Sequence, residues 1–251
     1  MKAMIFAAGL GTRLAPLTNE KPKALVEVHG VPLLELVIKR LRFFGYNDLI
    51  INVHHFPDMV LDFLKKNKNF GASITISDER DFLLDTGGGL KKVAGFFDNK
   101  PFLVHNVDVI SNLNLQDLYQ FHIQENALAT LAVKNRKTSR YFLFDGNFNM
   151  LGWKNMKSNE IKMTRVNTGK FAALAFSGIH VISPEIFNYI TQEGKFSITE
   201  LYLSLSSQHK ILGYQCEESF WMDLGNVQNL ANAEEFFKNY GINRLTGEQE
   251  D

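Results

Sequence analysis

Two glycines and two basic side chains lie close together near the N-terminus. Gly9 and Gly11 follow the apolar residues 4–6, which predict a buried strand. Glycine lets a backbone come within hydrogen-bonding distance of a flat or charged ligand. Arg13 and Lys23 follow, and positive charge beside a glycine-rich turn indicates a phosphate partner. The segment therefore predicts a phosphate site directly after a strand.

The turn does not fit two widespread nucleotide-binding fingerprints. A dinucleotide-binding fold needs a third glycine for close packing of helix on strand, but Leu14 occupies that position and Pro16 interrupts the helix. No G-x-x-x-x-G-K-[ST] motif occurs in the sequence. A nicotinamide or flavin site is therefore disfavoured, and a P-loop is excluded.

A second glycine-rich segment covers residues 85–90, at the predicted start of a helix. Each glycine in a helix costs about 0.8–1.0 kcal/mol relative to alanine, so Gly87, Gly88 and Gly89 predict a need for close backbone approach. Asp108 then follows a strand predicted over residues 101–105. A carboxylate there suits Mg²⁺, and the alternative is a cap for the next helix.

The N-terminal segment resembles that of the sugar-nucleotide pyrophosphorylases, which join a nucleoside triphosphate to a sugar 1-phosphate. Their pattern G-x-G-T-R-L-x-P-L-T, followed by P-K-x-L, occurs here at residues 9–18 and 22–25. The segment at 85–90 is similar to the family's glycine-rich loop beside the base and ribose. The resemblance implies nucleotide binding by nine residues, namely Ala7, Ala8, Gly9, Gly11, Thr12, Arg13, Glu79, Gly87 and Gly88. Glu79 would accept a hydrogen bond from either uracil N3–H or guanine N1–H.

The resemblance also implies the catalytic residues. Arg13 would hold the nucleotide phosphates, and Lys23 would neutralise charge during transfer. Trp221-x-Asp223-x-Gly225 is similar to the W-x-D-x-G element that closes the family's active site. Asp108 and Asp223 would then share one Mg²⁺ ion.

The expected sugar-binding residues are Asn106, Ser177 and Gly178. The family usually has glycine where this chain has Val107 and Phe142, so its sugar pocket departs from the common pattern. The short length and the D/E-T-G-G-G loop are most similar to N-acetylmuramate-1-phosphate uridylyltransferases and to proteins called mannose-1-phosphate guanylyltransferases. We expect UTP and N-acetylmuramate 1-phosphate or a related hexose 1-phosphate as substrates. The alternatives are a GTP-dependent mannose- or heptose-1-phosphate guanylyltransferase and a catalytically silent sugar-nucleotide-binding regulatory protein.

Strands and helices alternate over the first half of the chain. Apolar periodicity predicts helices over residues 32–44 and 57–66 and strands over 49–53 and 73–76. This alternation predicts an α/β fold with a three-layer, Rossmann-like, mostly parallel sheet. Catalytic groups should then collect at the carboxyl ends of the strands.

The second half has a different pattern. Short strands over 128–133, 141–144 and 150–153 predict an inserted antiparallel sugar-side subdomain, and residues 154–170 predict a mobile loop or lid. The remaining expected elements are a strand over 171–181, a helix from Ser183, helices over 198–207 and 227–240, and a strand over 211–216. With the resemblance, the expected fold is that of a GT-A-like nucleotidyltransferase. We expect one domain over 1–245, with a nucleotide half at about 1–125, a sugar half at about 126–245, and a tail at 246–251.

Composition narrows the class of protein. The 27 basic and 27 acidic side chains balance, and the sequence has no long basic run, so a nucleic-acid partner is disfavoured. No apolar stretch is long enough to span a membrane, and Met1 leads directly into a strand without a secretory signal. We expect a cytoplasmic monomer or homodimer. The single cysteine, Cys216, forms no internal disulfide and reads as part of a strand.

Overall fold

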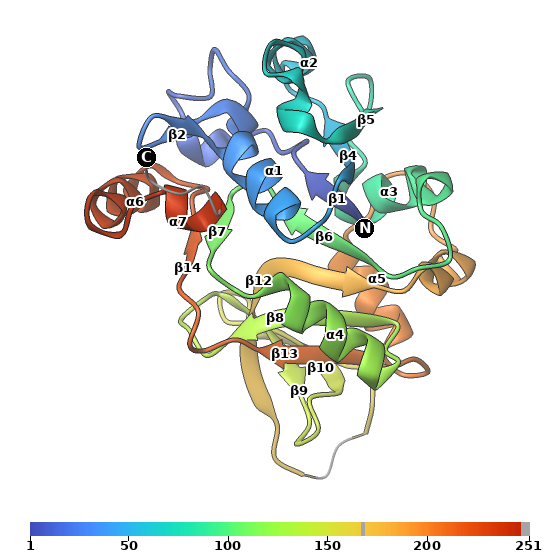
Figure 1. Ribbon diagram of the computed structural model, residues 1–251. Coiled ribbons are helices and arrows are strands. Elements are labelled where there is room, and N and C mark those ends of the chain that lie inside the picture. The colour runs from blue at the N-terminus through green and yellow to red at the C-terminus, as the bar shows by residue number, and fades with distance from the viewer. Residues whose placement is uncertain (167–168, 247–251) are drawn as a thin grey trace. The chain divides into compact units, whose positions relative to one another are not determined.

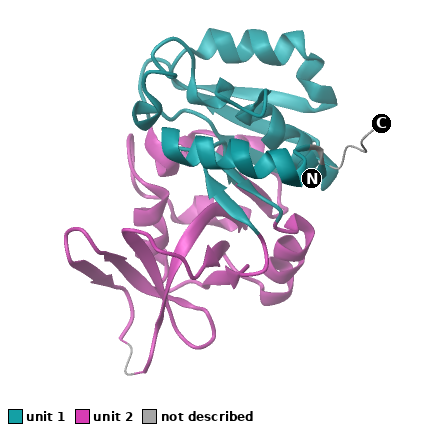
Figure 2. Cartoon of the chain, turned by 90° about the vertical axis from the view of Figure 1, so that its left-hand side faces the viewer, with its two compact units in different colours: residues 1–83, 105–112, 220–251 teal, residues 84–104, 113–219 magenta. Residues whose placement is uncertain are grey.

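The computed structural model describes residues 1–166 and 169–246, and the chain forms two compact units (Figures 1 and 2). Unit 1 combines Met1–Leu83, His105–Asn112 and Phe220–Asp251, and unit 2 combines Leu84–Val104 and Leu113–Ser219. Both units are discontinuous in sequence, and their boundaries differ from the expected division near residue 125. A single domain over 1–245 stays a prediction.

The sheet of unit 1 is parallel, as its continuous apolar strands predict. β1 (Lys2–Phe6) pairs with β4 (Asp48–Val53), which pairs in turn with β5 (Ser73–Asp78). Side chains of β1 and β4 are buried on both faces except at the first residue of each strand. The last two residues of β6 (Phe102–Asn106) also belong to unit 1.

Four α-helices accompany this sheet in the described part of unit 1. They are α1 (Leu33–Phe43), α2 (Pro57–Lys66), α6 (Val227–Tyr240) and the short α7 (Asn243–Thr246). The predicted bounds of α2 and α6 are confirmed. α1 ends before Gly45, whose φ of 82° is readily adopted only by glycine. Of the tail expected over residues 246–251, only Thr246 is described, and it is the last residue of α7. Residues 247–251 lie outside the described residues.

Two small antiparallel ribbons complete unit 1. β2 (Glu27–Val28) pairs with β3 (Val31–Pro32), and β7 (Val109–Ser111) pairs with β14 (Trp221–Asp223). The Ser111 hydroxyl also donates to the carbonyl of Phe220 over 2.7 Å. The β7–β14 ribbon joins segments that lie far apart in the sequence, and the periodicity of the sequence does not predict it.

The strands of unit 2 are mainly antiparallel, which confirms the predicted insertion. Besides the start of β6, the strands in the described part of unit 2 are β8 (Ala129–Lys134), β9 (Arg140–Phe144), β10 (Met150–Asn155), β11 (Glu160–Met163), β12 (Ala172–Ile182) and β13 (Ile211–Gln215). β12 pairs antiparallel with both β8 and β9, while β13 runs parallel to β8.

The prediction of a loop over residues 154–170 is wrong for its first half. β10 continues to Asn155 and pairs with β11, a strand that is exposed along its whole length. The sequence did not predict β11, because an exposed edge strand is held by backbone hydrogen bonds and needs no alternating apolar side chains. Gly152 permits the close pairing, since a Cβ there would overlap the carbonyl of Lys162. Residues 167–168 of the expected loop lie outside the described residues.

The α-helices of unit 2 are α3 (Asp85–Lys92), α4 (Leu115–Glu125) and α5 (Ile198–Leu205). The helix expected from Ser183 is instead the 3₁₀ segment η5 (Pro184–Tyr189), and α4 has no counterpart among the predictions. The other 3₁₀ segments in the described chain are η1 (Thr12–Leu14), η2 (Lys23–Leu25), η3 (Lys68–Gly71) and η4 (Ala94–Phe96). No helix in the described residues is both long and apolar enough to cross a membrane.

Candidate active site

The glycine-rich turn after β1 is held by its own hydrogen bonds. Gly11 adopts a φ of 68°, and its carbonyl accepts from the Thr18 hydroxyl over 2.9 Å and from the Leu14 N–H over 2.8 Å. A Cβ on Gly11 would lie 2.8 Å from Thr18 Cγ2. Gly9 differs, because nothing lies within 4 Å of the position that its Cβ would take. Gly11 therefore shapes the turn, while Gly9 leaves open space beside it.

Lys23 and Asp108 form an ion pair. Lys23 begins η2, and its Nζ donates to Asp108 Oδ2. The two side chains are only 12% and 16% exposed, so water screens this pair less than it would an exposed one. The pair connects the N-terminal motif to the end of β6, which the sequence alone could not establish.

The β7–β14 ribbon brings the two predicted metal ligands together. Asp223 lies opposite Val109 in the ribbon, and the N–H of Leu224 donates to the carbonyl of Asp108 over 2.7 Å. Asn229, in the first turn of α6, donates its side-chain amide to the carbonyl of Asp223 over 2.7 Å. Hydrogen bonds on both sides therefore hold the backbone of the second aspartate.

Gly225 marks the point where these side chains converge. A Cβ on Gly225 would lie 2.6 Å from Arg13 Nη2, 2.6 Å from Asp223 Oδ1 and 3.1 Å from Asp108 Oδ2. Its N–H donates to Asp223 Oδ1 over 2.7 Å. Gly225 was not among the predicted site residues, although the final glycine of W-x-D-x-G was the available signal.

The two carboxylates fit a magnesium ion. Asp223 Oδ1 and Asp108 Oδ2 both lie next to the position that a Cβ on Gly225 would occupy, so the two carboxylates border the same space. Mg²⁺ takes one or two protein carboxylates and keeps its other positions for water and substrate phosphates. No group of three or more His, Cys, Asp or Glu suited to a metal occurs in the described residues.

Two residues just before Asp108, His105 and Val107, are buried. Burial lowers the pKa of His105 to about 4, so its ring is neutral near pH 7 and its Nδ1 donates to the carbonyl of Asn106 over 2.8 Å. Val107 is buried and its φ is not positive, so this β-branched residue brings no strain of the kind that favours glycine. The backbone at this position therefore accommodates Val107 in place of the family's usual glycine.

Glu79 lies in a buried network beneath the turn. Its side chain is 2% exposed, and its Oε1 accepts from Asn52 Nδ2 over 2.8 Å. Asn52 Oδ1 in turn accepts from the backbone N–H of Ala7 over 2.8 Å. This arrangement ties the predicted base-reading carboxylate to the predicted nucleotide-binding backbone, and it makes Asn52 a structural link that the motifs did not indicate.

Four of the predicted site residues lie in unit 2, whereas Ala8, Thr12 and Asn106 lie in unit 1 with the residues above. Gly87 and Gly88 donate their N–H groups to the carbonyl of Phe196 over 2.9 and 3.2 Å. A Cβ on Gly88 would overlap the carbonyl of Gly194, so protein packing alone requires close approach here. Gly178, with a φ of 73°, follows the buried Ser177 where the β12–β8 register shifts. Binding of nucleotide by α3 and of sugar by residues 177–178 stays a prediction.

Comparison with known proteins identifies the family. The family model described as "Nucleotidyl transferase" matches residues 2–239. The chain belongs to this family. Membership confirms the recognition made from the N-terminal motif and the predicted enzyme class, a sugar-1-phosphate nucleotidyltransferase.

Curated relatives of this nucleotidyltransferase differ in nucleotide. The chain is 32% identical to the N-acetylmuramate alpha-1-phosphate uridylyltransferase of Caulobacter vibrioides, with 92% of this chain and 95% of the relative covered. It is also 32% identical to mannose-1-phosphate guanyltransferase 2 of Candida glabrata, covering 91% of this chain and 62% of the relative.

Solved structures confirm the fold class. UDP-glucose pyrophosphorylase in complex with UDP-glucose has a TM-score of 0.76 at 17% identity, with 95% of this chain and 98% of that chain covered. HddC from Yersinia pseudotuberculosis in complex with GMP-PN has a TM-score of 0.74 at 21% identity, with 94% and 99% covered. This nucleotidyltransferase therefore has the α/β fold of that group.

Proposed function

We propose that this chain transfers a nucleoside monophosphate from UTP to N-acetylmuramate 1-phosphate or a related hexose 1-phosphate. The observation that carries the proposal is the convergence of Arg13, Asp108 and Asp223 around Gly225, with Lys23 paired to Asp108. Two cations and two carboxylates at one point suit a reaction whose reactants are polyphosphate anions.

In the proposed reaction, an oxygen of the sugar 1-phosphate attacks the α-phosphorus of the triphosphate. The bond from the α-phosphorus to its bridging oxygen breaks, and its electron pair leaves with pyrophosphate. Arg13 and Lys23 hold and neutralise phosphate oxygens in line for this displacement. Asp108 and Asp223 would hold Mg²⁺, which supplies charge neutralisation at the phosphates when bound. Neither a covalent enzyme intermediate nor a general base is required.

The choice of UTP and of an N-acetylmuramate-type sugar is supported by the relative from Caulobacter, which matches this chain over nearly its whole length. GTP with mannose 1-phosphate is the second candidate, because a guanyltransferase matches with the same identity. A cytoplasmic location and a monomeric or homodimeric state stay predictions.

A pyrophosphate-release assay tests the proposal. The chain is incubated with MgCl₂, each of ATP, CTP, GTP and UTP, and a panel of sugar 1-phosphates that includes N-acetylmuramate, mannose and glucose 1-phosphates. We expect the highest kcat/KM for UTP with N-acetylmuramate 1-phosphate. A preference for GTP with mannose 1-phosphate would favour the second candidate. Nucleotide binding without any pyrophosphate release would contradict the proposal and favour a regulatory protein.

A further inference from the structure

β11 forms an outer edge of the antiparallel strands of unit 2. Among the described residues it pairs with β10 alone, and it stands last in the strand order. Such an edge presents backbone N–H and C=O groups that can pair with another chain. Neither a proline nor a register shift, two features that block pairing at an edge, interrupts β11. The edge is therefore open to a further strand.

The β10–β11 register determines which backbone groups of β11 point outward. Thr164, directly after β11, donates its N–H to the carbonyl of Leu151 over 2.8 Å. In an antiparallel ladder only every second residue directs its N–H and C=O toward the neighbouring strand. The residues of β11 in phase with Thr164 therefore pair with β10. Ile161 and Met163 are out of phase, so their N–H and C=O groups form the open edge.

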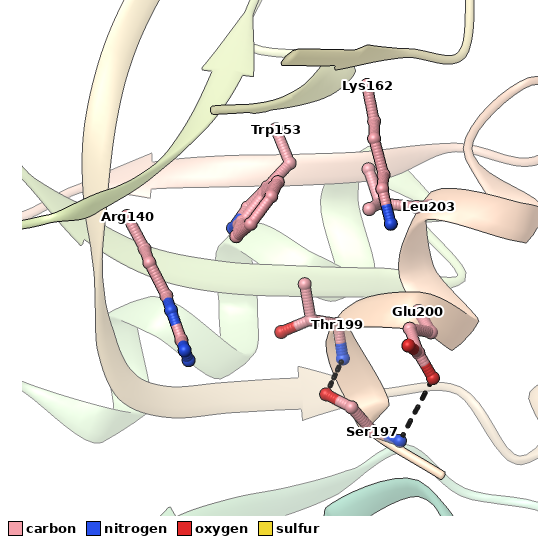
Figure 3. Close-up of a pocket in the computed structure, with 7 residues that line it drawn as sticks. All are labelled: Arg140, Trp153, Lys162, Ser197, Thr199, Glu200 and Leu203. Carbon is pink, nitrogen blue, oxygen red and sulfur yellow. Dashed lines mark hydrogen bonds between the residues drawn. The ribbon is translucent and has the colours of Figure 1, made fainter. Parts of the chain in front are cut away.

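The side chains of β11 differ in chemistry between the two faces of the sheet. Lys162 and Trp153 line the same pocket, between these strands and the start of α5 (Figure 3). Successive side chains of a strand alternate in direction, so Glu160 lies on the same face as Lys162. Ile161 and Met163 lie on the opposite face and are 53% and 46% exposed. The edge thus has a charged face and an apolar face.

A second copy of β11 complements the first in one antiparallel register. When Ile161 lies opposite the partner's Ile161, these two residues exchange both backbone hydrogen bonds. Glu160 then lies directly opposite the partner's Lys162, and by symmetry this ion pair forms twice. Registers centred on Glu160 or on Lys162 instead place like charges opposite each other, which is destabilising. Charge complementarity therefore favours the register centred on Ile161.

We propose that two copies of this chain associate through their β11 strands and form one continuous antiparallel sheet across a twofold axis. Pairing of two four-residue strands is expected to bury less surface than the roughly 1,200 Å² of a stable complex. The dimer is therefore weak and forms with rising protein concentration. The surface lies within unit 2, and the proposal does not depend on which sugar 1-phosphate the chain uses.

Sedimentation velocity over a concentration series tests the association. We expect the average mass to rise from that of one chain toward that of two between about 1 and 500 μM. Lys162→Glu places like charges opposite each other at two symmetric positions, so the dissociation constant should rise at least about tenfold. The double variant Glu160→Lys/Lys162→Glu exchanges the two charges and should restore the dissociation constant of the parent chain.

A charge change outside the strand is the matched control. Lys65→Glu alters an exposed lysine of α2, in unit 1, and should leave the dissociation constant within about twofold of the parent value. A parent chain that stays monomeric up to about 500 μM would overturn the inference. So would a dimer that Lys162→Glu does not weaken, or one that the charge exchange does not restore.

Amide hydrogen exchange of the parent chain, followed by NMR, tests the same interface without any variant. The N–H of Ile161 points away from β10 and should exchange rapidly at low protein concentration. Its exchange should slow at least about fivefold where dimers predominate, because it then donates to the partner strand. The N–H of Lys162, which points toward β10, should change less. Equal exchange rates of Ile161 at both concentrations would overturn the inference.

Discussion

Acidic and basic side chains of the candidate active site converge beside one glycine. A Cβ on Gly225 would lie 2.6 Å from both Arg13 Nη2 and Asp223 Oδ1, so alanine would displace these groups. The φ of Gly225 is not in the left-handed region, so alanine introduces no backbone strain of that kind. The displaced groups are the ends of side chains, which can move at little cost to folding.

We therefore expect Gly225→Ala to lower kcat/KM for pyrophosphate release by about 100-fold or more and to change the free energy of unfolding by less than about 1 kcal/mol. Steady-state kinetics and urea unfolding measure the two effects. Gly95→Ala is the control, because nothing lies within 4 Å of its added Cβ. Activity of Gly225→Ala close to that of the parent chain would contradict the assigned convergence.

At the scale of single residues, the sequence was most informative where the motif is contiguous. Residues 9–18 and 22–25 identified the family, because type and spacing could be compared position by position. Asn52 and Gly225 were not identified as site residues, because their roles depend on contacts with segments distant in the sequence. Short-range patterns carry no information about such contacts.

At the scale of elements, the glycine-rich start of α3 packs against the segment before α5. Alanine is the better helix former by about 1 kcal/mol per residue, which favours Gly88→Ala in isolation. The added Cβ would overlap the carbonyl of Gly194, and overpacking of this kind costs about 1–3 kcal/mol. The packing effect should therefore dominate.

We expect Gly88→Ala to lower the free energy of unfolding by up to about 2 kcal/mol, measured by urea denaturation. Gly95→Ala, in the following 3₁₀ segment η4, has no neighbour to overlap and serves as control. Stabilisation of the chain by Gly88→Ala would mean that helix propensity outweighs the packing observed here.

The predicted bounds of helices and strands were correct where the apolar periodicity of the sequence is strong. α2 and α6 have the predicted bounds because their apolar and polar faces alternate at helical spacing. β7 and β14 were missed as a pair because each is three residues long and the pairing spans more than a hundred residues. β11 was missed because all four of its side chains are exposed.

At the scale of the whole molecule, stability should depend on pH through a buried histidine. His122 contacts the Thr130 hydroxyl through Nδ1 and the Ser183 hydroxyl through Nε2, each over 2.9 Å. Burial lowers its pKa to about 4, whereas an unfolded chain has a histidine pKa of about 6.5. Between these values the unfolded state binds the extra proton, so acidification favours unfolding.

We expect the free energy of unfolding contributed by His122 to be complete above pH 6.5 and to decline by about 1–3 kcal/mol as the pH falls to 4. Urea unfolding at several pH values measures this slope. His122→Gln should reduce the slope relative to the parent chain. Equal slopes for His122→Gln and the parent chain would contradict the assignment.

The central claim is that Asp108 and Asp223 hold the metal half of a nucleotidyltransferase site whose cations are Arg13 and Lys23. The most direct measurement is kcat for pyrophosphate release by Asp108→Asn, with saturating MgCl₂ and substrates, beside the parent chain. Asparagine keeps the shape of the side chain but removes its charge. We predict a loss of at least about 100-fold in a chain that still unfolds cooperatively in urea, with a lower midpoint because the ion pair with Lys23 is lost. A kcat within about threefold of the parent chain would contradict the account.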